Sequence, residues 1–269
     1  YTFNVKLHHY VQHYQRRHRA MRHKLPAVIL PLGLFVIALL VVGGGSIKAI
    51  GQVPALILFS ALGASILRLV VSYLLSLAIG VPLALLAEGN HRIESILLPI
   101  YDVMESMPIL AFFPVIILFF VRYDWLEAAA VFIIFFNMLW NLVFNVIGGL
   151  KVVPRDIHAV ADVFGYHGLA RFRTFTLPAI FPSIVTGTIL AFAEGWNMLI
   201  VAEVLHTYAP LQSGAGDLFG IGSILVSSAA SGDNATFLAA TALILVAVVA
   251  VNLFVWQPML ARSERYTFE

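Results

Sequence analysis

The chain has 269 residues, of which 61% are hydrophobic and only 11% are charged, with a formal net charge of +2. An ordinary soluble domain is roughly half apolar and a quarter charged, so this composition excludes that class and indicates an integral membrane protein. The absence of cysteine excludes disulfides, thiolate metal sites and haem attachment through a CxxC motif.

Long apolar runs recur along the chain, and each can cross a hydrocarbon core of roughly 30 Å as a helix that rises ~1.5 Å per residue. They predict an all-α integral membrane protein with about six transmembrane helices, near Pro26–Val42, Leu56–Ala87, Leu97–Val121, Ala128–Ile147, Ala179–Leu205 and Ala235–Met259. The third run contains Pro99, Pro108 and Pro114, so we expect a kinked or broken helix there.

Lys and Arg fall almost entirely on one side of these predicted spans. Thirteen of them share the side that holds both termini, against only Lys48 and Arg122 on the other side. Cytoplasmic loops retain an excess of basic residues, so we expect both termini to be cytoplasmic. This orientation divides the chain into a basic juxtamembrane segment, a membrane domain and a tail, at residues 1–25, 26–260 and 261–269. We expect no cleavable signal peptide, because no small-residue cleavage site follows the first apolar run.

The same orientation makes residues 149–178 a cytoplasmic loop and residues 206–234 an external loop. The external loop contains no Lys or Arg, and its stretch LFGIGSILVSSA predicts a short surface helix or a re-entrant helix.

Motifs for catalysis and for nucleotide binding are missing from the sequence. No GxxxxGK[ST], HExxH or GxSxG motif occurs, and GGGSIK at 43–48 has the wrong spacing for a phosphate loop. We therefore expect neither enzyme activity nor a cofactor in this chain. His9 and His13 are spaced as two ligands on one helical face, but a basic segment resting on anionic headgroups is the favoured interpretation, so we expect no metal site.

Arg68 is the most unusual charge within the predicted spans. An ionised group there costs at least a few kcal/mol unless it is paired or hydrated. An ion pair is the favoured interpretation and direct contact with an anionic solute is the alternative; the candidate partners are Asp102, Glu105, Glu194 and Glu203.

The fifth predicted span carries further polar groups. Glu194 and Asn197 are three residues apart and share a helical face, which fits either a solute pathway or hydrogen bonding between helices. The stripe of Asn137, Asn141 and Asn145 on the fourth span favours helix packing first and a pathway second.

Residues 161–182, ADVFGYHGLARFRTFTLPAIFP, resemble the cytoplasmic loop of ABC-importer permeases. That loop has Glu-Ala-Ala, three residues, Gly, nine residues, Ile, one residue and Leu-Pro. Gly165, Leu177 and Pro178 match it, whereas Ala159 stands at the Glu position and Phe175 at the Ile position. Three further stretches, 65–86, 97–120 and GWNMLIVAEVL, are similar to permeases of the nitrate, sulfonate, taurine and bicarbonate group.

The resemblance implies a type I ABC-importer permease in the bacterial plasma (inner) membrane. The expected partners are a cytoplasmic ABC ATPase dimer that binds ATP and Mg, an extracytoplasmic solute-binding protein, the lipid membrane and a second permease unit, in a homodimer, a heterodimer or a fused repeat. No nucleic acid is expected. The solute implied is a small inorganic anion or a sulfonate. An ATPase-independent secondary transporter or channel is the alternative, and a membrane-embedded enzyme comes third.

The resemblance also implies that a short helix of the loop, here about Pro154 to Ala170, docks in a cleft of the ATPase. Because Ala159 lacks the charge of the usual Glu, packing rather than a salt bridge is the expected contact. The coupling residues implied are Pro154, Asp156, Ala159, Ala161, Gly165, Gly168, Leu177 and Pro178.

Overall fold

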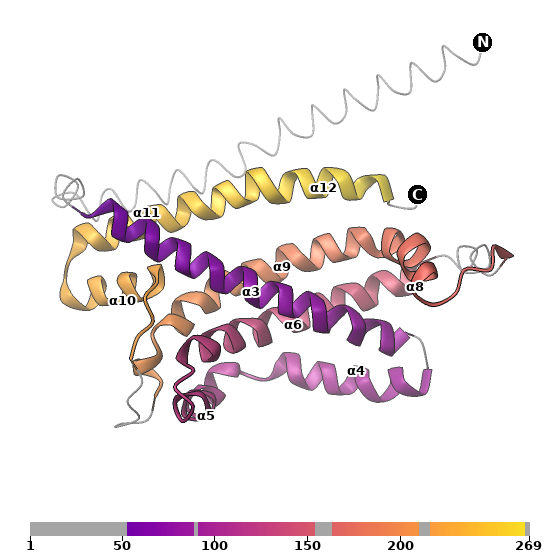
Figure 1. Ribbon diagram of the computed structural model, residues 1–269, viewed down its shortest axis with the longest axis horizontal. Coiled ribbons are helices and arrows are strands. Elements are labelled where there is room, and N and C mark those ends of the chain that lie inside the picture. The colour runs from indigo at the N-terminus through magenta and orange to yellow at the C-terminus, as the bar shows by residue number, and fades with distance from the viewer. Residues whose placement is uncertain (1–52, 89–90, 154–162, 210–215, 267–269) are drawn as a thin grey trace, which may run out of the picture. The chain divides into compact units, whose positions relative to one another are not determined.

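A computed structural model of the protein describes residues 53–88, 91–153, 163–209 and 216–266 (Figure 1). All of these except Val53 belong to one structural unit, residues 54–269. Every regular element in the described ranges is helical, as the composition predicts. The first predicted span, the juxtamembrane segment and the last three residues of the tail lie outside the described residues.

The described residues form nine α-helices. Their bounds are α3 (Ala55–Glu88), α4 (His91–Ser106), α5 (Ile109–Val121), α6 (Leu126–Val152), α8 (Gly168–Arg171), α9 (Leu177–Glu203), α10 (Ile221–Ser231), α11 (Asn234–Val251) and α12 (Gln257–Ser263). Two π-helical turns, Phe172–Thr176 and Asn252–Trp256, join α8 to α9 and α11 to α12, and two 3₁₀ turns cover Leu205–Thr207 and Glu264–Tyr266.

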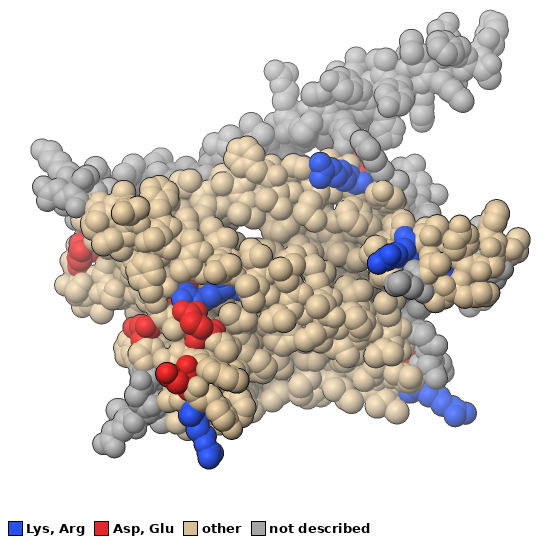
Figure 2. Space-filling view, viewed as in Figure 1, with Lys and Arg blue, Asp and Glu red and all other residues tan. Residues whose placement is uncertain are grey.

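Four continuous helical stretches are long and apolar enough to cross a membrane: Ala55–Ala87, Leu126–Val152, Phe172–Glu203 and Asn234–Ser263. They confirm the second, fourth, fifth and sixth predicted spans. On the face drawn in Figure 2, acidic and basic side chains lie toward the two ends of the helical unit and leave a broad middle without them. Such a band is what a hydrocarbon layer requires.

The third predicted span is a bent pair rather than one helix over Leu97–Val121. Residues Arg92–Ser106 and Ile109–Val121 meet at 88°. The break falls at Pro108, whose backbone is extended (ψ 95°) and precedes the first turn of α5. Proline lacks the N–H that would continue the helix, so the kink that the sequence predicts forms here. Pro99 and Pro114 remain inside α4 and α5.

The centre of the unit is α6, which packs against α3 on one side and α9 on the other (Figure 1). Small residues allow these helices to approach closely. A Cβ atom at Gly195 of α9 would lie 2.9 Å from Leu69 Cδ2 of α3. At the α8 end of the bundle, Lys151 Nζ lies 2.7 Å from Glu94 Oε1, which ties the end of α6 to α4.

Candidate functional site

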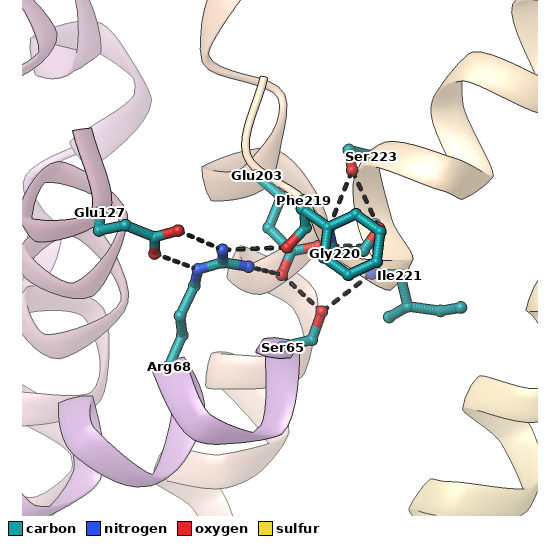
Figure 3. Close-up of polar contacts among 9 residues, drawn as sticks. Ser65, Arg68, Glu127, Glu203, Phe219, Gly220, Ile221 and Ser223 are labelled. Carbon is teal, nitrogen blue, oxygen red and sulfur yellow. Dashed lines mark hydrogen bonds and ion pairs between the residues drawn. The ribbon is translucent and has the colours of Figure 1, made fainter. Parts of the chain in front are cut away.

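The guanidinium of Arg68 joins three elements at the α10 end of the bundle (Figure 3). Its Nε and Nη2 donate to the two carboxylate oxygens of Glu127, at the start of α6, each at 2.7 Å. Its Nη1 donates to Glu203 Oε1 at 2.7 Å, and Nη2 also donates to the Phe219 carbonyl at 3.0 Å. Arg68 therefore connects α3 to the first turn of α6, the last turn of α9 and the segment that precedes α10.

Glu203 is completely buried, yet both of its carboxylate oxygens are satisfied. Ser65 Oγ donates to Oε1 at 2.5 Å, and the Gly222 amide donates to Oε2 at 2.8 Å. Ser65 Oγ in turn accepts from the Ile221 amide at 3.0 Å. The first amides of a helix have no intrahelical acceptor and carry partial positive charge, so α10 stabilises this carboxylate as Arg68 does.

Two glycines make this contact between α9 and α10 possible. A Cβ atom at Gly220 would lie 2.2 Å from Glu203 Cδ, and one at Gly222 would lie 2.7 Å from Ile200 Cα. Neither distance is compatible with a side chain. The GIGSIL stretch of the predicted external loop thus begins α10, the short helix that the sequence predicts, with its backbone against a buried carboxylate.

The two acidic partners of Arg68 differ greatly in exposure. The Glu203 side chain is 0% exposed, whereas the Glu127 side chain is 64% exposed. Glu203 was among the partners predicted from the sequence, but Glu127 was not. An acidic residue is common in the first turn of a helix because the helix dipole favours negative charge there, so Glu127 did not stand out in the sequence. Asp102, Glu105 and Glu194, the other candidate partners, do not pair with Arg68. Asp102 and Glu105 are exposed on α4.

Polar side chains also follow the line along which α6 packs against α9, which we call the α6–α9 seam. Asn137 Nδ2 donates to the Glu194 carbonyl at 3.5 Å. Further along, a Cβ atom at Gly187 would lie 2.8 Å from Asn145 Cβ. The asparagine stripe of α6 therefore packs against α9.

Glu194 and Asn197 are exposed at the edge of this seam. Within the described residues, the Glu194 carboxylate has neither a hydrogen bond nor an ion pair, and the Asn197 side chain likewise has no partner. Glu194 precedes Glu203 by nine residues, which places it about 14 Å deeper along the helix. It thus lies near the middle of the apolar stretch.

Only part of the predicted coupling loop is described. Pro154, Asp156, Ala159 and Ala161 lie outside the described residues. Gly165 and Gly168 have positive φ angles of 70° and 56°, so the helix expected to continue to Ala170 is interrupted, and α8 begins only at Gly168. Because left-handed backbone favours glycine, both positions serve the turn.

The two glycines do not serve close packing, since nothing lies within 4 Å of a Cβ atom placed at either one. Leu177 and Pro178, the matched Leu-Pro step, begin α9 directly after the π-helical turn Phe172–Thr176.

The turn ahead of α8 projects beyond the helix ends (Figure 1). It carries exposed apolar side chains. Val163 is 84% exposed and Phe164 is 70% exposed. Tyr166 packs edge-to-face on Phe175, with ring centroids 5.2 Å apart, so the aromatic residue at the Ile position anchors the turn. An apolar surface on a projecting turn is typical of a contact with another protein.

Comparison with known sequences decides the family. Residues 76–266 match the family described as binding-protein-dependent transport system inner membrane component. The chain belongs to this permease family. The matched region includes Glu127, the α6–α9 seam, Glu203 and the turn at Gly165, whereas Ser65 and Arg68 precede it.

Curated relatives of the permease carry names from the anion-importer group. The chain is 32% identical over 148 residues to the nitrate import permease protein NrtB of Leptolyngbya laminosa, which covers 55% of this chain and 52% of that protein. It is 27% identical over 142 residues to the bicarbonate transport system permease protein CmpB of Synechococcus elongatus (53% and 50% covered). It is 29% identical over 159 residues to the putative aliphatic sulfonates transport permease protein SsuC of Bacillus subtilis (59% and 55% covered).

The chain spans about half the length of the curated relatives it matches. Membership of this permease family, together with four long apolar helices and a bent pair, makes it a multi-pass protein of the plasma membrane. The family is a transport component rather than an enzyme, as the missing catalytic motifs predict.

Proposed function

We propose that this chain forms part of the membrane pathway of an ATP-driven importer for a small solute, an inorganic anion or a sulfonate. The match to a permease family over residues 76–266 carries the proposal. The substrate class rests on the printed names of the relatives, which are permeases for nitrate, bicarbonate and aliphatic sulfonates.

The pathway, in this proposal, runs along the α6–α9 seam. Glu194 and Asn197 are exposed on α9, about 14 Å and about 9 Å below its last residue. Polar groups at this depth face water or protein rather than lipid. Arg68 and Glu203 instead have a structural role at the outer end, because their charges are compensated and Glu203 is fully buried. Asp102 and Glu105 stay pathway candidates on the exposed face of α4.

The projecting turn is the proposed site of coupling to a cytoplasmic ATPase, which would hold ATP and Mg. Val163 and Phe164 offer it an apolar contact, and Arg173, in the π-helical turn that follows α8, adds an exposed basic group. A second permease unit and an extracytoplasmic binding protein complete the proposed importer.

A bulky charge in the turn tests this assignment. We expect Gly165→Glu to insert normally but to release the ATPase on purification and to lose ATP-driven uptake of labelled nitrate, bicarbonate or alkanesulfonate. Gly232→Glu is the matched control, since Gly232 also has a positive φ angle (75°) and open space around it but lies at the end of α10. Normal ATPase retention and uptake by Gly165→Glu contradict the coupling assignment.

A secondary transporter or channel is the second candidate, favoured by the unpaired carboxylate of Glu194, which would suit an ion relay. Purified chain in proteoliposomes distinguishes the two functions. Flux driven by an ion gradient alone supports the second candidate, and flux that requires the ATPase and ATP supports the first.

A further inference from the structure

The Glu194 carboxylate requires a partner that the described residues do not supply. An ionised carboxylate near the centre of the bilayer costs several kcal/mol unless a charge or water compensates it. Its helix α9 contains no Lys, Arg or His, and α6 contains only Lys151, at its far end, where Lys151 pairs with Glu94. Arg68 is held by two other carboxylates. Among the described residues of α3, α6 and α9, no basic side chain therefore compensates the Glu194 carboxylate.

The groups beside Glu194 suit a hydrogen-bond donor. Asn137 bonds the Glu194 backbone from α6, and Asn197 lies three residues further along the same face of α9. Both amides have an acceptor oxygen in addition to their NH₂ group. One carboxylate and two amide oxygens can together accept the several N–H donors of an ammonium group.

We propose that Glu194, with Asn137 and Asn197, forms a binding site for a positively charged nitrogen of the transported solute. The proposal rests on the pathway assigned above. It narrows the substrate class, since a solute that satisfies both this site and the anionic group suggested by the relatives is a zwitterion. A bare inorganic anion passing the same point would be repelled by Glu194.

The lack of cysteine in the chain gives a direct test, because a single introduced cysteine is the only thiol in it. Asn197→Cys is made in the full importer and labelled in membrane vesicles with two methanethiosulfonate reagents, one with a quaternary ammonium and one with a sulfonate. Ser227→Cys, on the exposed face of α10, corrects for the intrinsic reactivity of the reagents. After this correction, we expect the cationic reagent to react roughly tenfold faster or more at position 197.

A second substitution identifies the source of the preference. In the Asn197→Cys chain, Glu194→Gln removes the preference for the cationic reagent, and Glu194→Asp, which keeps the charge, retains it. Equal corrected rates with Glu194 intact overturn the cation site but leave the pathway in place. No labelling at position 197 while Ser227→Cys reacts overturns the pathway itself, and with it this proposal.

Discussion

The carboxylate of Glu203 accepts a hydrogen bond of 2.8 Å from the Gly222 amide, so the last residue of α9 holds the first turn of α10. The same carboxylate accepts from Arg68 and Ser65 of α3. Three helices thus share one buried charge, and the short helix α10 is tied to the two long ones by polar contacts. The stability of this end of the unit therefore depends on a few atoms.

Removing Glu203, the buried partner of Arg68, is expected to lower the free energy of unfolding far more than removing Glu127, the exposed partner. Glu203→Ala leaves a buried guanidinium without one carboxylate and takes the acceptor from α10, for an expected loss of about 3–5 kcal/mol. Glu127→Ala removes an ion pair whose carboxylate faces solvent, and we expect about 1 kcal/mol or less. The midpoint temperature of unfolding in detergent measures both. Equal losses would contradict the structural role assigned to Glu203.

A side chain at Gly220 is expected to destabilise the protein because of a steric clash. Backbone strain is not the reason, since the backbone of Gly220 is extended and any residue can adopt that conformation. Gly220→Ala places a methyl group 2.2 Å from Glu203 Cδ. The carboxylate must move, and we expect a loss of about 1–3 kcal/mol. Gly216→Ala, in the same segment with open space around it, is the control and is expected to have little effect. Thermal unfolding monitored by size-exclusion chromatography checks the pair, and a neutral Gly220→Ala would refute the close contact.

Two adjacent glycines of α6 test the α6–α9 seam. A Cβ atom at Gly149 would lie 2.5 Å from Ser183 Cβ, whereas nothing lies within 4 Å of one at Gly148. We expect Gly149→Ala to destabilise by about 1–3 kcal/mol. Gly148→Ala replaces glycine by a better helix former without a steric clash. It should leave the free energy of unfolding unchanged or raise it by up to about 1 kcal/mol. The double variant Gly149→Ala, Ser183→Gly should recover part of the loss. The same unfolding temperature reports all three, and similar behaviour of the two single variants would disprove this helix contact.

The start of α11 is expected to loosen in acid. Asp233 caps this helix, and its side chain accepts from the Thr236 amide at 3.1 Å. Hydrogen bonding to the Thr236 side chain, together with this backbone contact, holds the pKa of the carboxyl below its usual value. A lowered folded-state pKa means that the capping contribution is present above the unfolded pKa, about 4, and is lost as the pH falls through the folded pKa. Below pH 4, the protection of the Thr236 amide, measured as its exchange rate relative to the intrinsic rate at the same pH, should fall.

Asp233→Asn keeps an acceptor that does not titrate, so it should show no such acid-induced loosening. Identical profiles for the wild-type chain and Asp233→Asn would show that the cap does not respond to pH.

Local features of the sequence predicted the helices well. Runs of apolar residues located α3, α6, α9 and the α11–α12 stretch, because length and hydropathy are properties of a contiguous segment. Pro108 produced the predicted break. The matched Gly165 and Leu-Pro step led to the permease family, although the helix expected through Gly165 is interrupted by two left-handed glycines, a conformation that the spacing alone does not specify.

Local sequence patterns did not predict which residues of different helices are in contact. Arg68 and Glu127 are 59 residues apart and Arg68 and Glu203 are 135 apart, so no local pattern distinguishes these acids from Asp102 or Glu105. Likewise, position 220 requires glycine because the Glu203 side chain lies against it. The Glu194 side chain lacks a partner among the described residues because it lies on the part of α9 that does not pack against α6. The sequence by itself determined that this chain is a helical membrane permease. Only the tertiary structure decided which charges are paired, because pairing depends on distances that packing alone sets.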